Sequence, residues 1–116
     1  MKYKRIASAI HNVGGSFLGF TNYWDDGYVV DDLAAVHRAG LDIEIDWLAG
    51  EIAPESLFQP RVRKSVDYLR SRLRDQLASE AVDIAAIKDL RLVWPANSYP
   101  RMVAIDDRGR SHKSVL

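Results

Sequence analysis

The sequence predicts an α+β protein in which two to three helices pack on one face of a small, mainly antiparallel sheet that ends in a C-terminal β-hairpin. Apolar residues recur at helical spacing before residue 23 and again over 61–79. They alternate with acidic residues over 41–48, and two short apolar runs flank a glycine turn near the C-terminus. A chain of 116 residues is typical of one domain, so we expect residues 1–116 to share one core.

The first helix is expected over about residues 2–22. Its apolar stripe repeats at spacings of three and four and comprises Tyr3, Ile6, Ile10, Val13, Phe17 and Phe20. Glycines inside this stripe each cost about 1 kcal/mol relative to alanine. A shorter helix that ends at Asn12, followed by a strand over 16–20, is therefore the alternative. The unbroken stripe favours the long helix, in which Gly15 and Gly19 let another element approach closely.

A turn over 22–27 leads to a second helix expected over 28–39, which Gly40 is placed to end. His37 lies near the end of this helix, where a protonated imidazole interacts well with the helix dipole. Residues 41–48 then change period, because Ile43, Ile45 and Trp47 alternate with acidic residues. This alternation predicts a strand with one apolar face and one acidic face.

Residues 49–60 are expected to be a connection, and Pro60 suits the first position of a helix over 61–79. Strands are predicted over 89–94, 101–106 and 110–115, the last two forming an antiparallel hairpin. Gly109 fits the left-handed position of its three-residue loop. We expect Asp106 and Arg110 to face each other across the hairpin as an exposed ion pair, and His112 to face water.

Composition excludes several classes of function. The chain has no cysteine, which excludes disulfides, thiolate metal sites and cysteine nucleophiles. Sixteen basic residues balance sixteen acidic ones, so strong attraction to nucleic acid or to an anionic membrane is not implied. No apolar run approaches the roughly 20 residues that span a bilayer. These features favour a cytoplasmic protein that works without a cofactor.

One acidic pattern suggests a metal-dependent alternative. Asp42, Glu44 and Asp46 would project from one face of the predicted strand, where oxygen ligands can hold Mg²⁺ or Mn²⁺. A strand-borne nuclease would also want a lysine two residues after its acidic residue, but Asp46 follows Glu44 at that spacing. A solvated sheet face is the simpler interpretation, and a metal-dependent hydrolase or nuclease is the alternative.

The two halves of the chain differ in charge. Residues 1–58 hold four Lys/Arg and nine Asp/Glu, whereas residues 59–116 hold twelve and seven. The helix over 61–79 carries many of the arginines, which gives a third hypothesis of nucleic-acid binding through this helix. Its arginines are spread around much of the helix circumference, so this hypothesis ranks below the others.

Aromatic residues beside turns are the candidate partner-binding residues, because such side chains anchor many interfaces. They form two groups, one near the first turn and one at the proline loop over 95–100: Tyr23, Trp24, Asp25 and Asp26, and Trp94 and Tyr99. The sequence therefore predicts a non-catalytic protein-interaction module, of the inhibitor, immunity or adaptor kind. A homodimer is slightly favoured over a monomer, through the first helix with its aromatic turn or through the terminal hairpin.

Overall fold

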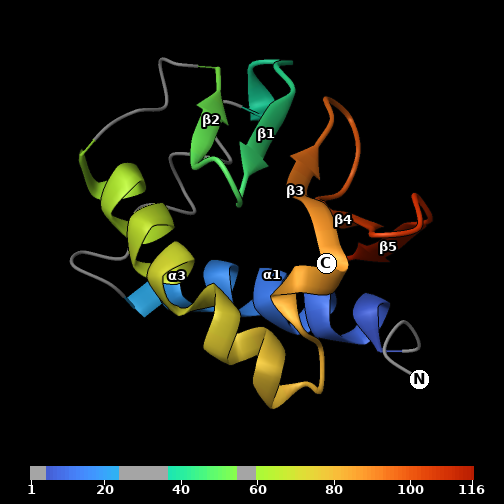
Figure 1. Ribbon diagram of the computed structural model, residues 1–116. Coiled ribbons are helices and arrows are strands. Elements are labelled where there is room, and N and C mark those ends of the chain that lie inside the picture. Colours follow the sequence, from blue (N-terminus) through green and yellow to red (C-terminus); the bar gives the residue numbers. More distant parts are fainter. Residues whose placement is uncertain (1–4, 24–36, 55–59) are drawn as a thin grey trace.

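Two helices on one face of a five-stranded antiparallel sheet make up the part of the chain described by the computed structural model, residues 5–23, 37–54 and 60–116 (Figure 1). The elements are α1 (Ile6–Tyr23), β1 (Ile43–Asp46), β2 (Glu51–Ala53), α3 (Pro60–Ser79), the 3-10 turn η2 (Ile84–Ala86), β3 (Ile87–Trp94), β4 (Arg101–Asp106) and β5 (Ser111–Val115). The strand order is β2-β1-β3-β4-β5, which places β3 in the middle. The expected α+β class and C-terminal hairpin are confirmed.

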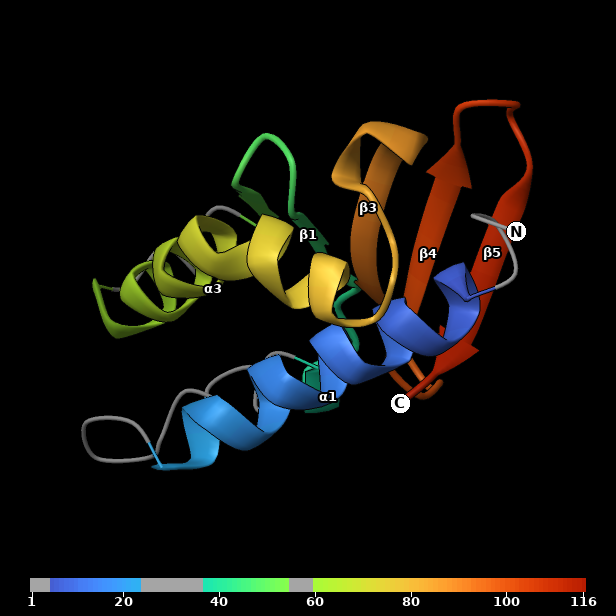
Figure 2. The same ribbon diagram turned by 60° about the horizontal axis from the view of Figure 1, so that its bottom comes forward.

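The first helix is continuous through the glycines, which confirms the helical interpretation over the strand alternative. The sequence predicted a close approach of another element at Gly15, but the structure has this approach at Gly14 instead. A Cβ atom on Gly14 would lie 2.6 Å from Met102 Cγ and 2.7 Å from Leu116 Cδ1, whereas one on Gly15 would meet nothing within 4 Å. Gly14 therefore lets α1 lie close against β4 and the C-terminus, as Figure 2 shows.

Most of the expected second helix lies outside the described residues. Within them, His37 and Arg38 are helical, and Gly40 has a φ of +83°. Its N–H donates to the carbonyl of His37 at 3.0 Å, which closes the last turn. Neither described helix, α1 or α3, is long and apolar enough to cross a bilayer.

The predicted strand over 41–48 is present as β1, but the following connection contains a further strand, β2, that the sequence pattern did not indicate. β2 has three residues and one buried side chain, Ile52, so it offers no alternation to recognise. The turn between the strands is built by Asp46, whose Oδ1 accepts the N–H groups of Leu48 and Ala49, both at 3.0 Å. Gly50 completes the turn with a φ of +79°.

The register divides the sheet into a helix-facing inner face and an opposite outer face. Inner residues on β3 and β4 include Leu90, Leu92, Met102, Ala104 and Asp106. The outer face bears the alternate side chains, which are Glu51, Ala53, Glu44, Asp46, Asp89, Arg91, Val93, Arg101, Val103, Ile105, Ser111, Lys113 and Val115. The hairpin loop has the expected form, with Gly109 at a φ of +79°.

Two expectations for the hairpin are wrong. Asp106 is buried on the inner face, and its Oδ1 accepts the N–H groups of Arg108 and Arg110 at 2.8 and 3.0 Å. Its Oδ2 lies 2.8 Å from Nε2 of His112, whose side chain is only 17% exposed. The reason is strand parity: His112 pairs with Ala104 in the register and so points toward the helices.

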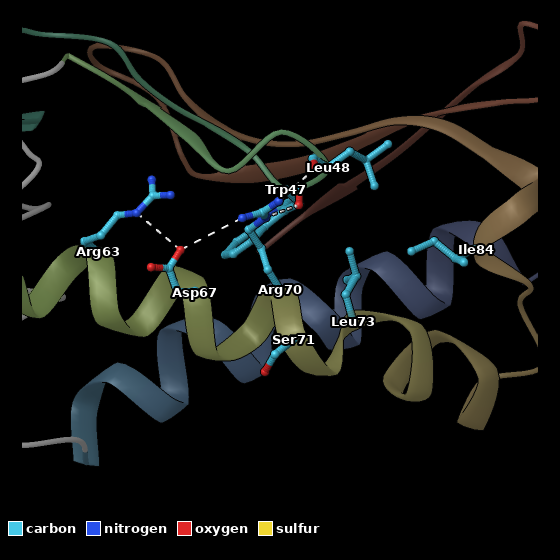
Figure 3. Close-up of a pocket in the computed structure, with 8 residues that line it drawn as sticks. All are labelled: Trp47, Leu48, Arg63, Asp67, Arg70, Ser71, Leu73 and Ile84. Carbon is cyan, nitrogen blue, oxygen red and sulfur yellow. Dashed lines mark hydrogen bonds and ion pairs between the residues drawn. The ribbon is translucent and has the colours of Figure 1, made fainter.

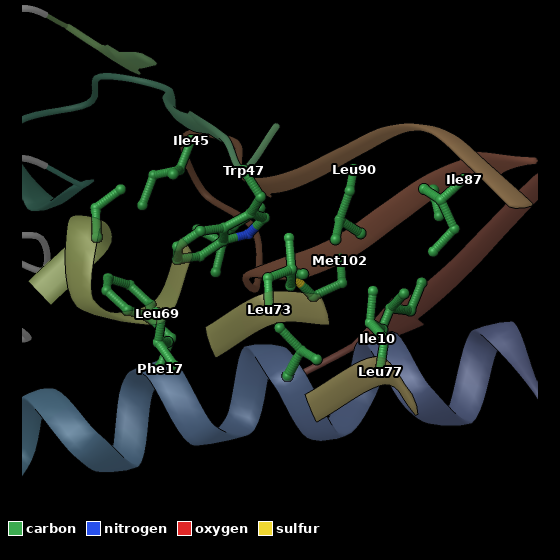
Figure 4. Packing of buried hydrophobic residues seen from close by; sticks show 14 of the residues in the cluster. Ile10, Phe17, Ile45, Trp47, Leu69, Leu73, Leu77, Ile87, Leu90 and Met102 are labelled. Atoms are coloured by element: carbon green, nitrogen blue, oxygen red, sulfur yellow. The ribbon is translucent and has the colours of Figure 1, made fainter. Parts of the chain in front are cut away.

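One apolar cluster fills the space between the sheet and the helices (Figure 4). From α1 it takes Ile10 and Phe17, and from α3 it takes Leu69, Leu73 and Leu77. The inward side chains of the sheet complete it, as the alternation over 41–48 predicted. This core fixes both helices on the inner face.

Candidate functional site

The acidic residues of β1 pair with an arginine of the neighbouring strand β3. Glu44 Oε1 lies 2.6 Å from Nη1 of Arg91, and Asp46 Oδ2 lies 3.3 Å from Nη2 of the same residue. Asp89 on β3 accepts from Arg91 Nε at 2.9 Å, so one guanidinium holds three carboxylates. The hydrogen bonds that Arg91 donates to Asp89 and then to Glu44 raise the pKa of Arg91 above its usual value. Asp42 accepts the N–H of Ala96 at 2.7 Å instead.

Across the described ranges, no group of three or more His, Asp or Glu side chains is arranged to hold a metal ion. The outer strand face is therefore a salt-bridge network around Arg91, close to the simpler interpretation of a solvated charged face.

A shallow pocket of about 600 Å³ lies between α3 and the β1–β2 turn (Figure 3). Its charged side chains are engaged with the protein itself. Arg70 donates from Nε to the carbonyl of Trp47 at 3.1 Å and from Nη2 to that of Leu48 at 3.0 Å. Arg63 donates to the carbonyl of Gly50 and pairs with Asp67 at 3.2 Å. These arginines join α3 to the turn, so part of the positive charge of this helix serves the fold.

Two hydrogen-bonded pairs, Asp106 with His112 and His11 with Ser114, together contain an aspartate, a histidine and a serine, the residue types of a catalytic triad. The three types do not form one connected chain, because they are divided between the two pairs. His112 pairs with the buried carboxylate of Asp106, which is how an aspartate orients a catalytic histidine. The serine contact belongs to a different histidine, since His11 Nδ1 lies 2.8 Å from Ser114 Oγ. Each pair ties β5 either to β4 or to α1. His11 is exposed.

The Asp106 pair predicts a particular acid sensitivity. The hydrogen bond from His112, followed by those from the Arg110 and Arg108 N–H groups, lowers the pKa of Asp106 from 3.8 to about 2. The ionised Asp106 carboxylate therefore contributes its full stabilisation of the folded state above pH 3.8, and this contribution is lost as the pH falls to about 2. We expect Asp106→Asn to lower the Tm by about 5 °C at pH 5 and by progressively less below pH 4. Thermal unfolding of both proteins from pH 5 to 2 measures this; a constant difference would contradict it.

Of the predicted partner-binding residues, the structure describes the surroundings of Trp94 and Tyr99. Trp94 is a structural anchor of the loop over 95–100, because its Nε1 donates to the carbonyl of Ser98 at 3.0 Å. Its indole ring stacks on His37 with ring centroids 4.7 Å apart. Tyr99 is 75% exposed. Tyr23 is the last residue of α1, and 24–26 lie outside the described residues.

His37 lies in the last helical turn, near the helix end as expected, and its ring also connects this region of the chain to the loop over 95–100. Its Nε2 lies 2.9 Å from the carbonyl oxygen of Pro95, in addition to the stack on Trp94. The Ala96 N–H, held by Asp42, is a further connection across the same loop. The loop that carries Tyr99 is therefore fixed from several sides.

Exposed apolar side chains gather at this end of the sheet. Among the described residues, four large apolar side chains are exposed, and three of them lie here: Leu41 (48%), Tyr99 (75%) and Val115 (64%). The register places all three at the same end of the sheet, because Ile43 of β1 pairs with Trp94, and Arg101 after the loop pairs with Val115. The C-terminus lies beside the loop in Figure 2, and Leu116 N donates to the Pro100 carbonyl at 2.9 Å. We call this group, Leu41, Tyr99 and Val115, the apolar end.

The sequence analysis identified Tyr99 as a candidate partner-binding residue and placed Val115 at the end of a predicted hairpin strand, but it did not connect either residue with Leu41. Only the strand register brings the three together, and no local pattern contains that information. No known protein family matches this sequence, and neither a curated protein nor a solved structure shows significant similarity to the chain.

Proposed function

We propose that this protein is a non-catalytic interaction module that binds another protein through the apolar end of its sheet. The observation that carries the proposal is the gathering of three exposed large apolar side chains at one end. Single exposed apolar residues are normal on a soluble protein, whereas a group of them is typical of a contact surface. Tyrosine is also enriched among the residues that contribute most to binding.

The rigidity of the loop supports the same proposal. Trp94, His37 and Asp42 all contact the loop over 95–100, so Tyr99 is presented from a backbone that is already ordered. Binding to an ordered loop avoids the entropy cost of fixing it, which favours affinity. The arrangement fits an inhibitor, an immunity protein or an adaptor, all of which act by occupying a surface of their partner.

The experiment compares capture by three forms of the full-length chain: the unaltered protein, Tyr99→Ala and Tyr68→Ala. Tyr68 is a matched control, because it is an exposed tyrosine on α3, away from the apolar end. Each form is immobilised, exposed to lysate of the cells that make the protein, and the captured proteins are quantified by mass spectrometry.

A partner that binds the apolar end should be captured at least about fivefold less by Tyr99→Ala and equally by Tyr68→Ala. Tyr99 is largely exposed, so its removal should leave stability within about 0.5 kcal/mol, which circular dichroism on heating checks. Captured proteins that Tyr99→Ala retains in full, or that both variants lose alike, would contradict the proposal.

A further inference from the structure

The outer face of the sheet is divided by charge. The strands on one side, β1 and β2, present the carboxylates of Glu44, Asp46 and Glu51. The strands on the other side, β4 and β5, present the cations Arg101 and Lys113. The central strand β3 separates them, and its Arg91 pairs with Asp89 on the same strand and with Glu44 and Asp46 of β1, which leaves Glu51 outside this network. An acidic half and a basic half therefore lie on opposite sides of β3.

Apolar side chains lie among these charges. Val93, Val103 and Ile105 are half-buried on the outer face, and Val115 is exposed. Both described helices pack on the inner face, as Figures 1 and 2 show. The face thus combines apolar area that association would bury with charges that would select the orientation of what covers it.

We propose that a second copy of this chain covers the outer face, related by a two-fold axis that runs along β3. A two-fold interface places the same surface on both sides, so it must be complementary to itself. A face with one acidic and one basic half, separated by its middle strand, meets this requirement. The outer face shares Val115 with the apolar end, but Leu41 and Tyr99 do not belong to its strands.

The strand register shows which groups would meet. Rotation about an axis along β3 places β1 over β4 and β2 over β5 of the other copy, and it preserves each residue's position along the strands. Glu44, in register with Val93 and so with Arg101, would face Arg101 of the partner subunit. Glu51, in register with Asp46 and so with Lys113 through β3 and β4, would face Lys113 of the partner subunit.

Charge also excludes the other face-to-face arrangement. An axis across the strands would place each strand over its own counterpart, so the acidic half would face the acidic half. Packed sheets lie about 10 Å apart with their strands within about 30° of one another. Glutamate, lysine and arginine side chains extend far enough to meet across that distance.

The size of the face predicts a weak dimer. Five strands about 4.8 Å apart and about five residues long give a face of about 24 by 17 Å. This is about half of the roughly 800 Å² that each partner contributes to a standard interface. We therefore expect dissociation in the range of tens to hundreds of micromolar, with a dependence on salt because the paired charges are at the surface.

The arrangement has one consequence for binding, and this consequence rests on the proposed function. An axis along the strands leaves the same end of both sheets pointing in the same direction. The two loops that carry Tyr99 would then lie side by side at one end of the dimer. A partner with two matching surfaces would bind both at once, with the gain in affinity that linkage of two sites gives.

The experiment uses two single charge reversals on exposed side chains, Lys113→Glu and Glu51→Lys. The first places a carboxylate in the basic half and the second places an ammonium group in the acidic half, so each reversal opposes like charges at the Glu51–Lys113 contact, and symmetry alters that contact twice. In an equimolar mixture, the remaining Glu51 and Lys113 face each other, and the two introduced charges also face each other. The matched controls are Arg74→Glu and Asp75→Lys, which make the same changes in net charge on the exposed side of α3.

Sedimentation equilibrium is measured from about 5 to 500 µM, which spans the expected dissociation constant. We expect dimerisation that weakens between about 50 and 500 mM salt. Each outer-face variant alone should weaken it at least tenfold, the mixture should restore it to within threefold, and the controls should leave it unchanged. A 13.1 kDa species at every concentration would overturn the proposal, as would a dimer that neither reversal affects or that the mixture does not restore.

The two proposals fail separately, because these variants leave Tyr99 in place. A monomer that still captures a partner through Tyr99 removes the dimer and keeps the apolar end. A dimer with the expected charge dependence, together with capture that does not depend on Tyr99, keeps the dimer and removes the apolar end as the binding surface.

Discussion

Replacing Leu73 with alanine is expected to lower the free energy of unfolding by about 2–5 kcal/mol. Leu73 lies in the middle of the buried stripe of α3 and is 4% exposed. It packs in the cluster between the helix and the sheet, where removing three carbon atoms leaves a cavity that rigid neighbours cannot close. The measurement is urea unfolding followed by circular dichroism. The slope of the unfolding free energy against urea concentration is compared between the unaltered protein and Leu73→Ala, to confirm that both expose the same surface on unfolding.

Leu41→Ala is the matched control for this experiment. The same atoms are removed from a side chain that is 48% exposed, so the expected change is within about 0.5 kcal/mol. A loss below about 1 kcal/mol for Leu73→Ala would mean that the inward face of α3 is not the one described. Equal losses at the two positions would mean that exposure does not decide the cost.

Periodic elements were predictable because their signal is local. The stripes of α1 and α3 repeat every three or four residues, and β1 alternates every two, so each element carries its own evidence. The hairpin loop was predictable for a related reason, since Gly109 adopts the left-handed conformation that its turn requires. In these segments, local preference and the final fold agree.

Elements and contacts that depend on distant residues were not predictable. β2 exists because Ile52 pairs with Ile45 and fills the inner face, and three residues are too few to show a pattern. The orientation of His112 depends on strand parity, which a shift of one residue reverses. His37 is placed by a loop almost sixty residues further along the chain, which its own surroundings in the sequence do not reveal.

The candidate site shows the same division. Aromatic residues beside a proline loop indicated Trp94 and Tyr99, but only hydrogen bonds distinguish the structural role of the first from the exposure of the second. Leu41 belongs to the apolar end through the pairing of β1 with β3. The alternation over 41–48 predicted one acidic strand face, whereas the division of the outer sheet face into an acidic and a basic half follows from strand order.

Trp47→Ala is expected to be at least as damaging as the change at Leu73, with a loss of about 3–5 kcal/mol. Trp47 is 1% exposed and is the largest fully buried side chain among the described residues. Its ring meets that of Phe17 edge to face, with centroids 5.0 Å apart and an interplanar angle of 75°. This contact joins the end of β1 to α1, so its removal opens a cavity between the sheet and the helix.

Trp47→Phe separates two contributions of the same side chain. The indole Nε1 of Trp47 is buried and has no hydrogen-bond partner within the described part of the chain. An unpaired buried donor costs about 1–3 kcal/mol, and phenylalanine removes that donor while keeping a ring against Phe17. We therefore expect Trp47→Phe to cost less than about 1.5 kcal/mol in urea unfolding, because the removed donor offsets part of the lost volume. A cost equal to that of Trp47→Ala would show instead that the indole volume, and not the unpaired N–H, determines stability at this position.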